Sequence, residues 1–100
     1  MNRLAAVIDE AAGAVGATRR ARGEEADYEI DGVIVAGLGP SGAEFRVGPE
    51  VAAAALGTPD TFASGRGPGW VGFRPRTLDR FALDRIAAWL GLAARLSLPR

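Results

Sequence analysis

The chain of 100 residues contains no cysteine, no histidine and no lysine, so its 12 basic residues are all arginine. Without cysteine it cannot form disulfides, thiolate nucleophiles or cysteine-based metal sites. Histidine is the usual general base near neutral pH and the commonest metal ligand, and lysine supplies Schiff bases and the phosphate-binding cation of P-loops. Catalysis would have to use carboxylates, hydroxyl groups, Tyr28 or the backbone. We therefore expect a protein without enzymatic activity, cofactor or metal.

Long apolar runs are also missing. No segment approaches the roughly 20 consecutive apolar residues that cross a bilayer. Asp9 and Glu10 interrupt the apolar N-terminal segment, which argues against a signal peptide. With 48% apolar and 24% charged residues the chain is globular, and 100 residues suit one domain over residues 1–100. We expect a cytoplasmic protein that has no membrane partner.

The net charge of zero conceals an uneven distribution. Residues 1–60 hold five arginines against ten acidic residues, whereas residues 61–100 hold seven arginines against two acidic residues. The two parts therefore carry −5 and +5. Such asymmetry can steer a charged partner toward one side of a protein.

Hydrophobic spacing predicts helices at both ends of the chain. The first runs from about Asn2 to Ala17, and the last begins near Thr77. The buried stripe expected on the last helix comprises Ala82, Ile86, Trp89, Leu90, Ala93 and Leu96. A short helix is expected over 49–56, because Pro49 suits the first helical position and Gly57 follows the last.

Strands are expected between these helices. Residues 26–31 alternate apolar and acidic side chains, and Asp31-Gly32 is a preferred type I′ hairpin turn. Residues 33–38 form a strand that is apolar on both faces, so we expect it to be covered on both sides or to lie centrally, and residues 43–47 alternate again. A fourth strand covers 70–74 after a glycine-rich loop over 58–69. The predicted fold is α+β, with an antiparallel sheet of about four strands, helices packed on it in two layers, and the order α-β-β-β-α-β-α.

The segment Gly37-x-Gly39-x-x-Gly42 has the glycine spacing of a dinucleotide-binding loop. Such a loop must lead from a strand into a helix, so that the phosphates meet the helix N-terminus. Here the following residues, AEFRV, have the period of a strand. We therefore interpret these glycines as hairpin residues, and the second match at Gly67-x-Gly69-x-x-Gly72 in the same way.

Two charged groups remain as candidates. The acidic residues of 24–31 could coordinate a cation, but along a strand they point in one direction rather than converge, so we favour a solvated face that protects an edge strand. Arginines next to aromatic residues are typical of nucleic-acid surfaces and of protein contacts, although ordinary packing with solvated arginines gives the same pattern. The candidate partner or nucleic-acid patch comprises Arg66, Trp70, Arg74 and Arg76.

The runs Phe45-Arg46-Val47-Gly48-Pro49-Glu50 and Gly67-Pro68-Gly69-Trp70-Val71 resemble the TfoX/Sxy N-terminal domain family. Trp89 matches a tryptophan in the last helix of that family, and the likeness spans most of 2–97. The Met-Phe-Gly-Gly segment of the family is replaced by Arg22-Gly23-Glu24-Glu25. The resemblance implies an α+β domain with a non-enzymatic role in competence and transcription regulation. It suggests an unidentified protein partner, with nucleic acid and a homodimer as further options.

Overall fold

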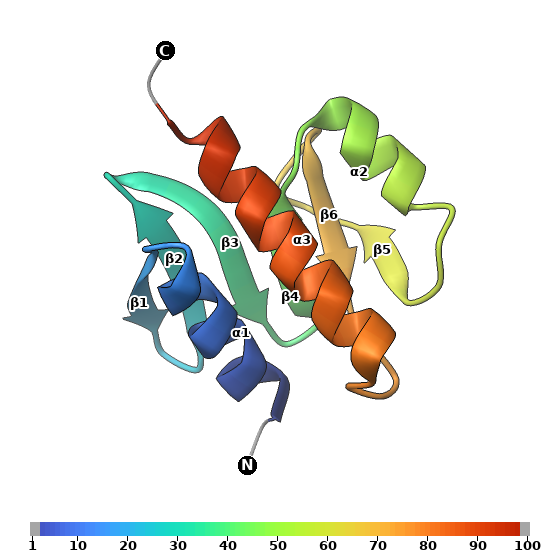
Figure 1. Ribbon diagram of the computed structural model, residues 1–100, viewed down its shortest axis with the longest axis horizontal. Coiled ribbons are helices and arrows are strands. Elements are labelled where there is room, and N and C mark those ends of the chain that lie inside the picture. Colours follow the sequence, from blue (N-terminus) through green and yellow to red (C-terminus); the bar gives the residue numbers. More distant parts are fainter. Residues whose placement is uncertain (1–2, 99–100) are drawn as a thin grey trace.

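The computed structural model describes residues 3–98, which form three helices and six strands (Figure 1). The helices are α1 (Arg3–Ala14), α2 (Pro49–Ala55) and α3 (Arg80–Leu96). The strands are β1 (Thr18–Arg22), β2 (Glu25–Ile30), β3 (Val33–Gly39), β4 (Gly42–Arg46), β5 (Thr61–Ala63) and β6 (Trp70–Phe73). The predicted α+β class is confirmed, with two more strands than expected.

The six strands form one antiparallel sheet in the order β1-β2-β3-β4-β6-β5. Helices α1 and α3 pack against each other and against the sheet, and α2 packs beside β6 (Figure 1). The core lies between the helix layer and the sheet. Its largest fully buried side chains are Tyr28, Phe45, Phe73, Ile8, Ile86, Leu90, Val35, Val47 and Val71.

The hairpin between β2 and β3 follows the sequence prediction. Asp31 and Gly32 have φ angles of 50° and 81°, the positive values that a type I′ turn requires. Val35 has no partner on β2, because the register shifts between Tyr28 and Glu29. Because of this bulge, the consecutive residues Val35 and Ala36 are both buried. The apolar strand lies centrally in the sheet, as expected.

Helix α1 is shorter than predicted. It ends at Ala14 rather than Ala17, because Gly16 adopts a φ of 82° and the backbone N–H of Ala17 donates to the carbonyl of Ala12 over 2.9 Å. These are the features of a Schellman motif, which closes a helix with a left-handed residue. The expected start at Asn2 lies outside the described residues.

Helix α3 starts at Arg80 because the side chain of Asp79 accepts a hydrogen bond from the backbone N–H of Ala82 over 3.0 Å. The predicted stripe is buried or half-buried, except for Leu96, which is exposed. Trp89 is half-buried, with its ring centroid 5.7 Å from that of Phe45. None of the helices within 3–98 has the length and hydropathy needed to cross a bilayer.

Two strands were missed. β1 has the sequence TRRAR, which lacks any apolar periodicity, and all five of its residues are exposed. It forms because a two-residue turn pairs Arg22 with Glu25, and the ladder continues from there to the pair Thr18 and Glu29. β5 lies inside the predicted glycine-rich loop and has only three residues. Since β1 takes the edge position, β2 is an interior strand, and the predicted role of its acidic residues as an edge guard is wrong.

Candidate interaction surface

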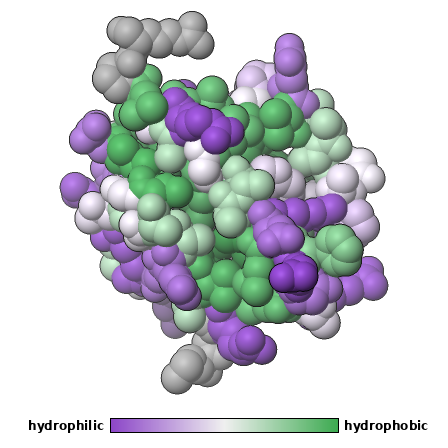
Figure 2. All heavy atoms as spheres, viewed as in Figure 1, coloured by the Kyte–Doolittle hydropathy of each residue, from purple (hydrophilic) through white to green (hydrophobic). Residues whose placement is uncertain are grey.

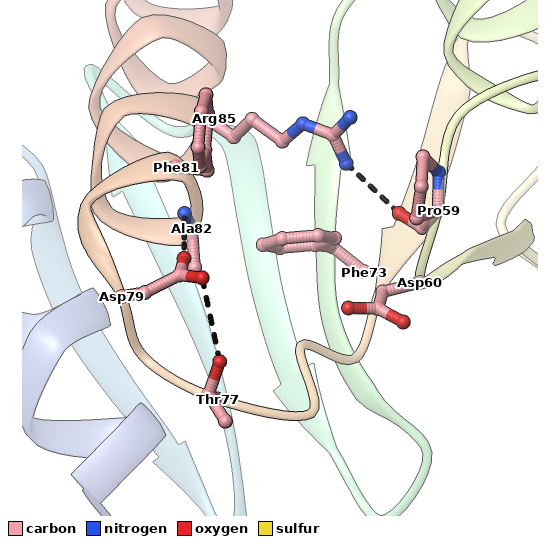
Figure 3. Close-up of a pocket in the computed structure, with 8 residues that line it drawn as sticks. All are labelled: Pro59, Asp60, Phe73, Thr77, Asp79, Phe81, Ala82 and Arg85. Carbon is pink, nitrogen blue, oxygen red and sulfur yellow. Dashed lines mark hydrogen bonds between the residues drawn. The ribbon is translucent and has the colours of Figure 1, made fainter.

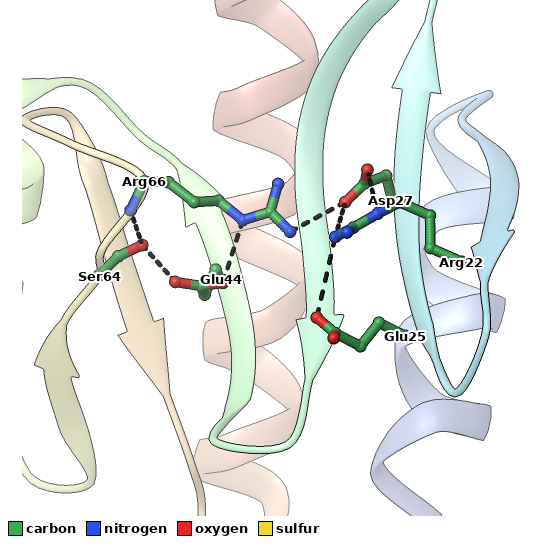
Figure 4. Close-up of polar contacts among 6 residues, drawn as sticks. All are labelled: Arg22, Glu25, Asp27, Glu44, Ser64 and Arg66. Atoms are coloured by element: carbon green, nitrogen blue, oxygen red, sulfur yellow. Dashed lines mark hydrogen bonds and ion pairs between the residues drawn. The ribbon is translucent and has the colours of Figure 1, made fainter.

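One face of the sheet carries no helix, and we call it the open face. Residues on alternate positions of paired strands share a face, so the register identifies its members. They are Thr18, Arg20, Arg22, Glu25, Asp27, Glu29, Ile34, Gly37, Gly39, Gly42, Glu44, Arg46, Phe62, Trp70, Gly72 and Arg74. In Figure 4 this face is seen with helix α3 behind the sheet.

Arg66 crosses the open face from the loop between β5 and β6 (Figure 4). Its Nε donates to Oε1 of Glu44 on β4 over 3.0 Å, and its Nη2 donates to Oδ1 of Asp27 on β2 over 2.9 Å. The guanidinium carbon also lies 5.0 Å from the ring centroid of Trp70. Ser64 anchors the loop, since its hydroxyl donates to Glu44 and accepts from the backbone N–H of Arg66.

The path of Arg66 depends on Gly37 in the intervening strand β3. A Cβ atom at that position would stand 2.1 Å from Nη2 of Arg66. Glycine therefore leaves the space in which the guanidinium lies flat on the sheet. The interpretation of Gly37 as a hairpin residue is wrong: it lies inside β3, and its lack of a side chain serves this packing.

Gly42 has the turn role that the sequence predicted. Its φ is 132°, and a Cβ there would stand 2.6 Å from the carbonyl oxygen of Phe73. It leads from the turn into strand β4 rather than into a helix. A phosphate-binding loop requires a helix at that point. The topology therefore excludes a dinucleotide-binding loop at Gly37-x-Gly39-x-x-Gly42.

Asp27 is the most enclosed ionised group of the open face, with a side chain 12% exposed. Arg22 approaches it from the other side, and the Nε of Arg22 lies 2.9 Å from its Oδ2. Burial raises the pKa of Asp27, but the hydrogen bonds from Arg66 and Arg22 outweigh burial and hold that pKa below its ordinary 3.8. Asp27 is therefore a paired carboxylate, not part of the solvated acidic face that the sequence suggested.

The charges of the open face lie in two layers. The carboxylates of Asp27 and Glu29 are 12% and 18% exposed, whereas their partners Arg22 and Arg20 are 52% and 76% exposed. In these two pairs the carboxylate lies at the sheet and the arginine projects toward solvent, whereas Arg66 is only 22% exposed and Glu25, beside Arg22, is 46% exposed. Among residues 3–98, Arg46 and Arg74 form no ion pair at all. The outer layer of this face is consequently basic.

The structure brings three of the four predicted patch residues together. Trp70 and Arg74 lie on β6 and just beyond it, and Arg66 stacks on Trp70. Arg76 does not belong to this group. It follows Pro75, is 92% exposed, and places its Nε 3.5 Å from Oδ1 of Asp60.

Sequence reasoning missed Arg46 and Phe62, which complete this part of the open face. Arg46 pairs directly with Trp70 across β4 and β6, and the ring of Phe62 lies against Gly72. The alternation of 43–47 could have identified Arg46, because it places this side chain on the face of the strand opposite to the core residues Phe45 and Val47. Phe62 carried no such signal, because β5 itself was not predicted.

A hollow of about 300 Å³ lies at the start of α3, away from the open face (Figure 3). Its polar groups serve the fold: Asp79 caps the helix, and Nη1 of Arg85 donates to the carbonyl of Pro59 over 2.8 Å. Arg85 also stacks against Phe73, at 5.6 Å from the ring centroid. No group of three acidic residues within 3–98 is arranged to hold a metal ion there or elsewhere.

The helix-covered side shows apolar and polar side chains interspersed (Figure 2). A shallow groove of about 410 Å³ separates α1 from α3, lined mainly by apolar residues such as Val7 and Leu83. Phe81, at the start of α3, is 81% exposed. These features are neutral, in contrast to the basic outer layer of the open face.

Comparison of the chain with protein-family models, with curated proteins and with solved structures finds no match. By its fold and its candidate site, the protein is an α+β domain that has a six-stranded antiparallel sheet and an open face with arginines and aromatic residues. The resemblance to the TfoX/Sxy N-terminal domain family remains an expectation from the sequence runs described above.

Proposed function

We propose that this protein is a non-enzymatic regulatory module that binds a protein partner through its open face. The observation that supports this proposal is the layered charge of that face, with arginines outermost and Trp70 among them. Arginine and tryptophan are enriched among the residues that dominate protein–protein binding energy. The resemblance to the TfoX/Sxy family favours regulation of competence or transcription as the process served.

The partner surface that fits is acidic. Arg46 and Arg74 have no carboxylate partner within 3–98, so an acidic surface would satisfy them without breaking an existing ion pair. Arg66 is different, because Asp27 and Glu44 already hold it. Complementary charge raises the association rate and selects among partners, and both effects weaken with salt.

The test is affinity capture by the full chain from a nuclease-treated lysate of its own organism. We expect one stoichiometric protein to be captured by the wild type and by the control Arg80→Glu/Arg95→Glu, but lost with Arg46→Glu/Arg74→Glu. Both variants change the charge equally, and the control arginines are exposed and lie on α3. Hydrogen exchange on the purified complex should show protection along β6. Equal capture by both variants, or protection elsewhere, would contradict the proposed surface.

Direct binding of nucleic acid is the second candidate function. It is favoured by one specific observation, the presence of both Trp70 and Phe62 on the basic open face. Aromatic side chains on a sheet beside arginines suit the stacking of bases and the neutralisation of phosphates. Capture that disappears after nuclease treatment would support this candidate over a protein partner.

A further inference from the structure

Strand β6 presents a row of three groups on the open face. Trp70, Gly72 and Arg74 occupy alternate positions, so they follow one another at roughly 7 Å. Gly72 has no side chain, but its place in the row is taken by the ring of Phe62, which comes from its partner position on β5. Along the strand the row therefore reads indole, phenyl ring, guanidinium.

The phenyl ring lies on the strand because position 72 is glycine. A Cβ at Gly72 would stand 2.2 Å from Cε2 of Phe62, so any other residue would push the ring away. Phe62 and Trp70 are each half-buried, which leaves part of each ring exposed on the open face. Two aromatic surfaces thus stand side by side on a rigid, hydrogen-bonded strand pair.

Cationic groups flank this aromatic pair. Arg46 is directly opposite Trp70 on β4, and Arg74 ends the row beyond Phe62. The carboxylate between them, Glu44, is engaged by Arg66 and Ser64. Arg66 also stacks on the indole, which fixes the orientation of the Trp70 ring while two carboxylates fix Arg66 itself.

We propose that the row along β6 binds single-stranded nucleic acid, with bases stacked on Trp70 and Phe62 and with phosphates bound by Arg46 and Arg74. This inference rests on the second candidate function, direct binding of nucleic acid through the open face, and it specifies a single strand as the ligand. A peptide of acidic residues alone would use the two arginines but would leave the adjacent rings without a stacking partner. A duplex fits less well, because its bases already stack on one another and the rings would meet only the backbone.

The probe is fluorescein-labelled oligothymidylate of about ten nucleotides, a length that covers the row with room on both sides. Anisotropy at low ionic strength should show binding, with quenching of tryptophan fluorescence. We expect Trp70→Leu and Phe62→Leu each to weaken binding about tenfold, since one stacked base contributes that much. The quenching should vanish in Trp70→Leu, because the other tryptophan, Trp89, packs against core rings.

The arginines are tested by salt dependence. Arg46→Gln and Arg74→Gln should each reduce the slope of log affinity against log salt by about 0.7, the value for one phosphate contact on a single strand. Arg95→Gln, which removes the same charge from the end of α3, should leave the slope unchanged. Trp70→Phe keeps a stacking ring and should retain most of the affinity, which separates loss of stacking from a folding defect.

Several outcomes would overturn the inference. They are absence of binding at low salt, binding that ignores Trp70 and Phe62, equal effects of Arg95→Gln and Arg74→Gln, and tighter binding of a duplex of the same length. If polyglutamate binds in place of the oligonucleotide and depends on Arg46 and Arg74, the open face is a protein surface. In that case this inference fails while the proposed protein-binding function stands.

Discussion

The side chain of Arg66 lies across the backbone of Gly37, where a Cβ atom would come within 2.1 Å of its Nη2. The contact joins the loop before β6 to the middle of β3, and beyond it to Asp27, which is 39 residues away along the chain. The glycine and the arginine therefore form one packing unit. This unit connects the loop between β5 and β6 to β4, β3 and β2 on the open face.

Gly37→Ala is expected to lower the free energy of unfolding by about 1–3 kcal/mol, because it removes Arg66 from the enclosed carboxylate of Asp27. In an Arg66→Ala background the same change should be neutral or stabilising, since alanine is preferred to glycine in a strand interior by about 0.5–1 kcal/mol. Urea unfolding of the wild type, the two single variants and the double variant measures the coupling energy between positions 37 and 66.

Gly91→Ala on α3 is the matched control, because a Cβ there meets nothing within 4 Å. It should stabilise the protein by about 1 kcal/mol, the difference in helix propensity. Replacing glycine by alanine is thus expected to lower the free energy of unfolding at position 37 and to raise it at position 91. Additive effects of Gly37→Ala and Arg66→Ala would show that they do not form one unit.

The replacement Arg66→Lys is expected to cost nearly as much stability as Arg66→Ala, about 1–2 kcal/mol. Arginine reaches Glu44 and Asp27 with two different nitrogens, 3.0 Å and 2.9 Å from the respective oxygens. A lysine ammonium is a single point charge and cannot span the two carboxylates. Thermal unfolding of both variants tests this, and full stability of Arg66→Lys would mean that the charge alone suffices.

The pairing of Asp27 predicts a loss of stability in acid. Its pKa is lowered on folding, so the native carboxylate binds fewer protons than the unfolded one, and its contribution is present above about pH 4 and lost as the pH falls further. The free-energy difference between wild type and Asp27→Asn should therefore be largest near neutrality and shrink in acid. Urea unfolding over a pH series measures it, and a difference that stays constant with pH would contradict the assignment.

Local patterns in the sequence were sufficient to predict much of the fold. Asp31-Gly32 indicated its turn because only a few residue pairs accept two positive φ angles. The alternation of 43–47 separated Phe45 from Arg46, and the stripe on α3 was largely correct. These features depend on residues close together in the chain, where periodicity and turn chemistry act directly.

The site could be predicted only in part, because it depends on long-range register. Arg66 and Trp70 were recognised as a patch, but the contacts of Arg66 with Asp27 and Glu44 involve strands distant in sequence. Nothing local distinguishes Gly37, which makes room for an arginine, from the nearby turn glycine Gly42. Strand β1 was missed for a related reason: it is specified by pairing with β2 rather than by burial of its own side chains.

Tyr28, the only tyrosine in the chain, gives a direct optical test of the docking of α1 on the sheet. Its side chain is buried, and its hydroxyl donates a hydrogen bond to Asp9 on α1. Burial, and then the hydrogen bond and charge of Asp9, raise the pKa of Tyr28 well above its ordinary 10.0. A pKa raised on folding means that the full contribution to stability is present below pH 10 and is lost as the pH rises beyond it.

We therefore expect no tyrosinate absorbance from the folded protein at pH 10, with ionisation appearing only at higher pH together with loss of helical circular dichroism. Asp9→Ala should move the onset of ionisation to lower pH while burial still keeps it above 10. Tyr28→Phe should abolish the absorbance change, which confirms its origin. Ionisation near pH 10 with the helical signal intact would mean that the hydroxyl is accessible to solvent and that α1 does not close over it.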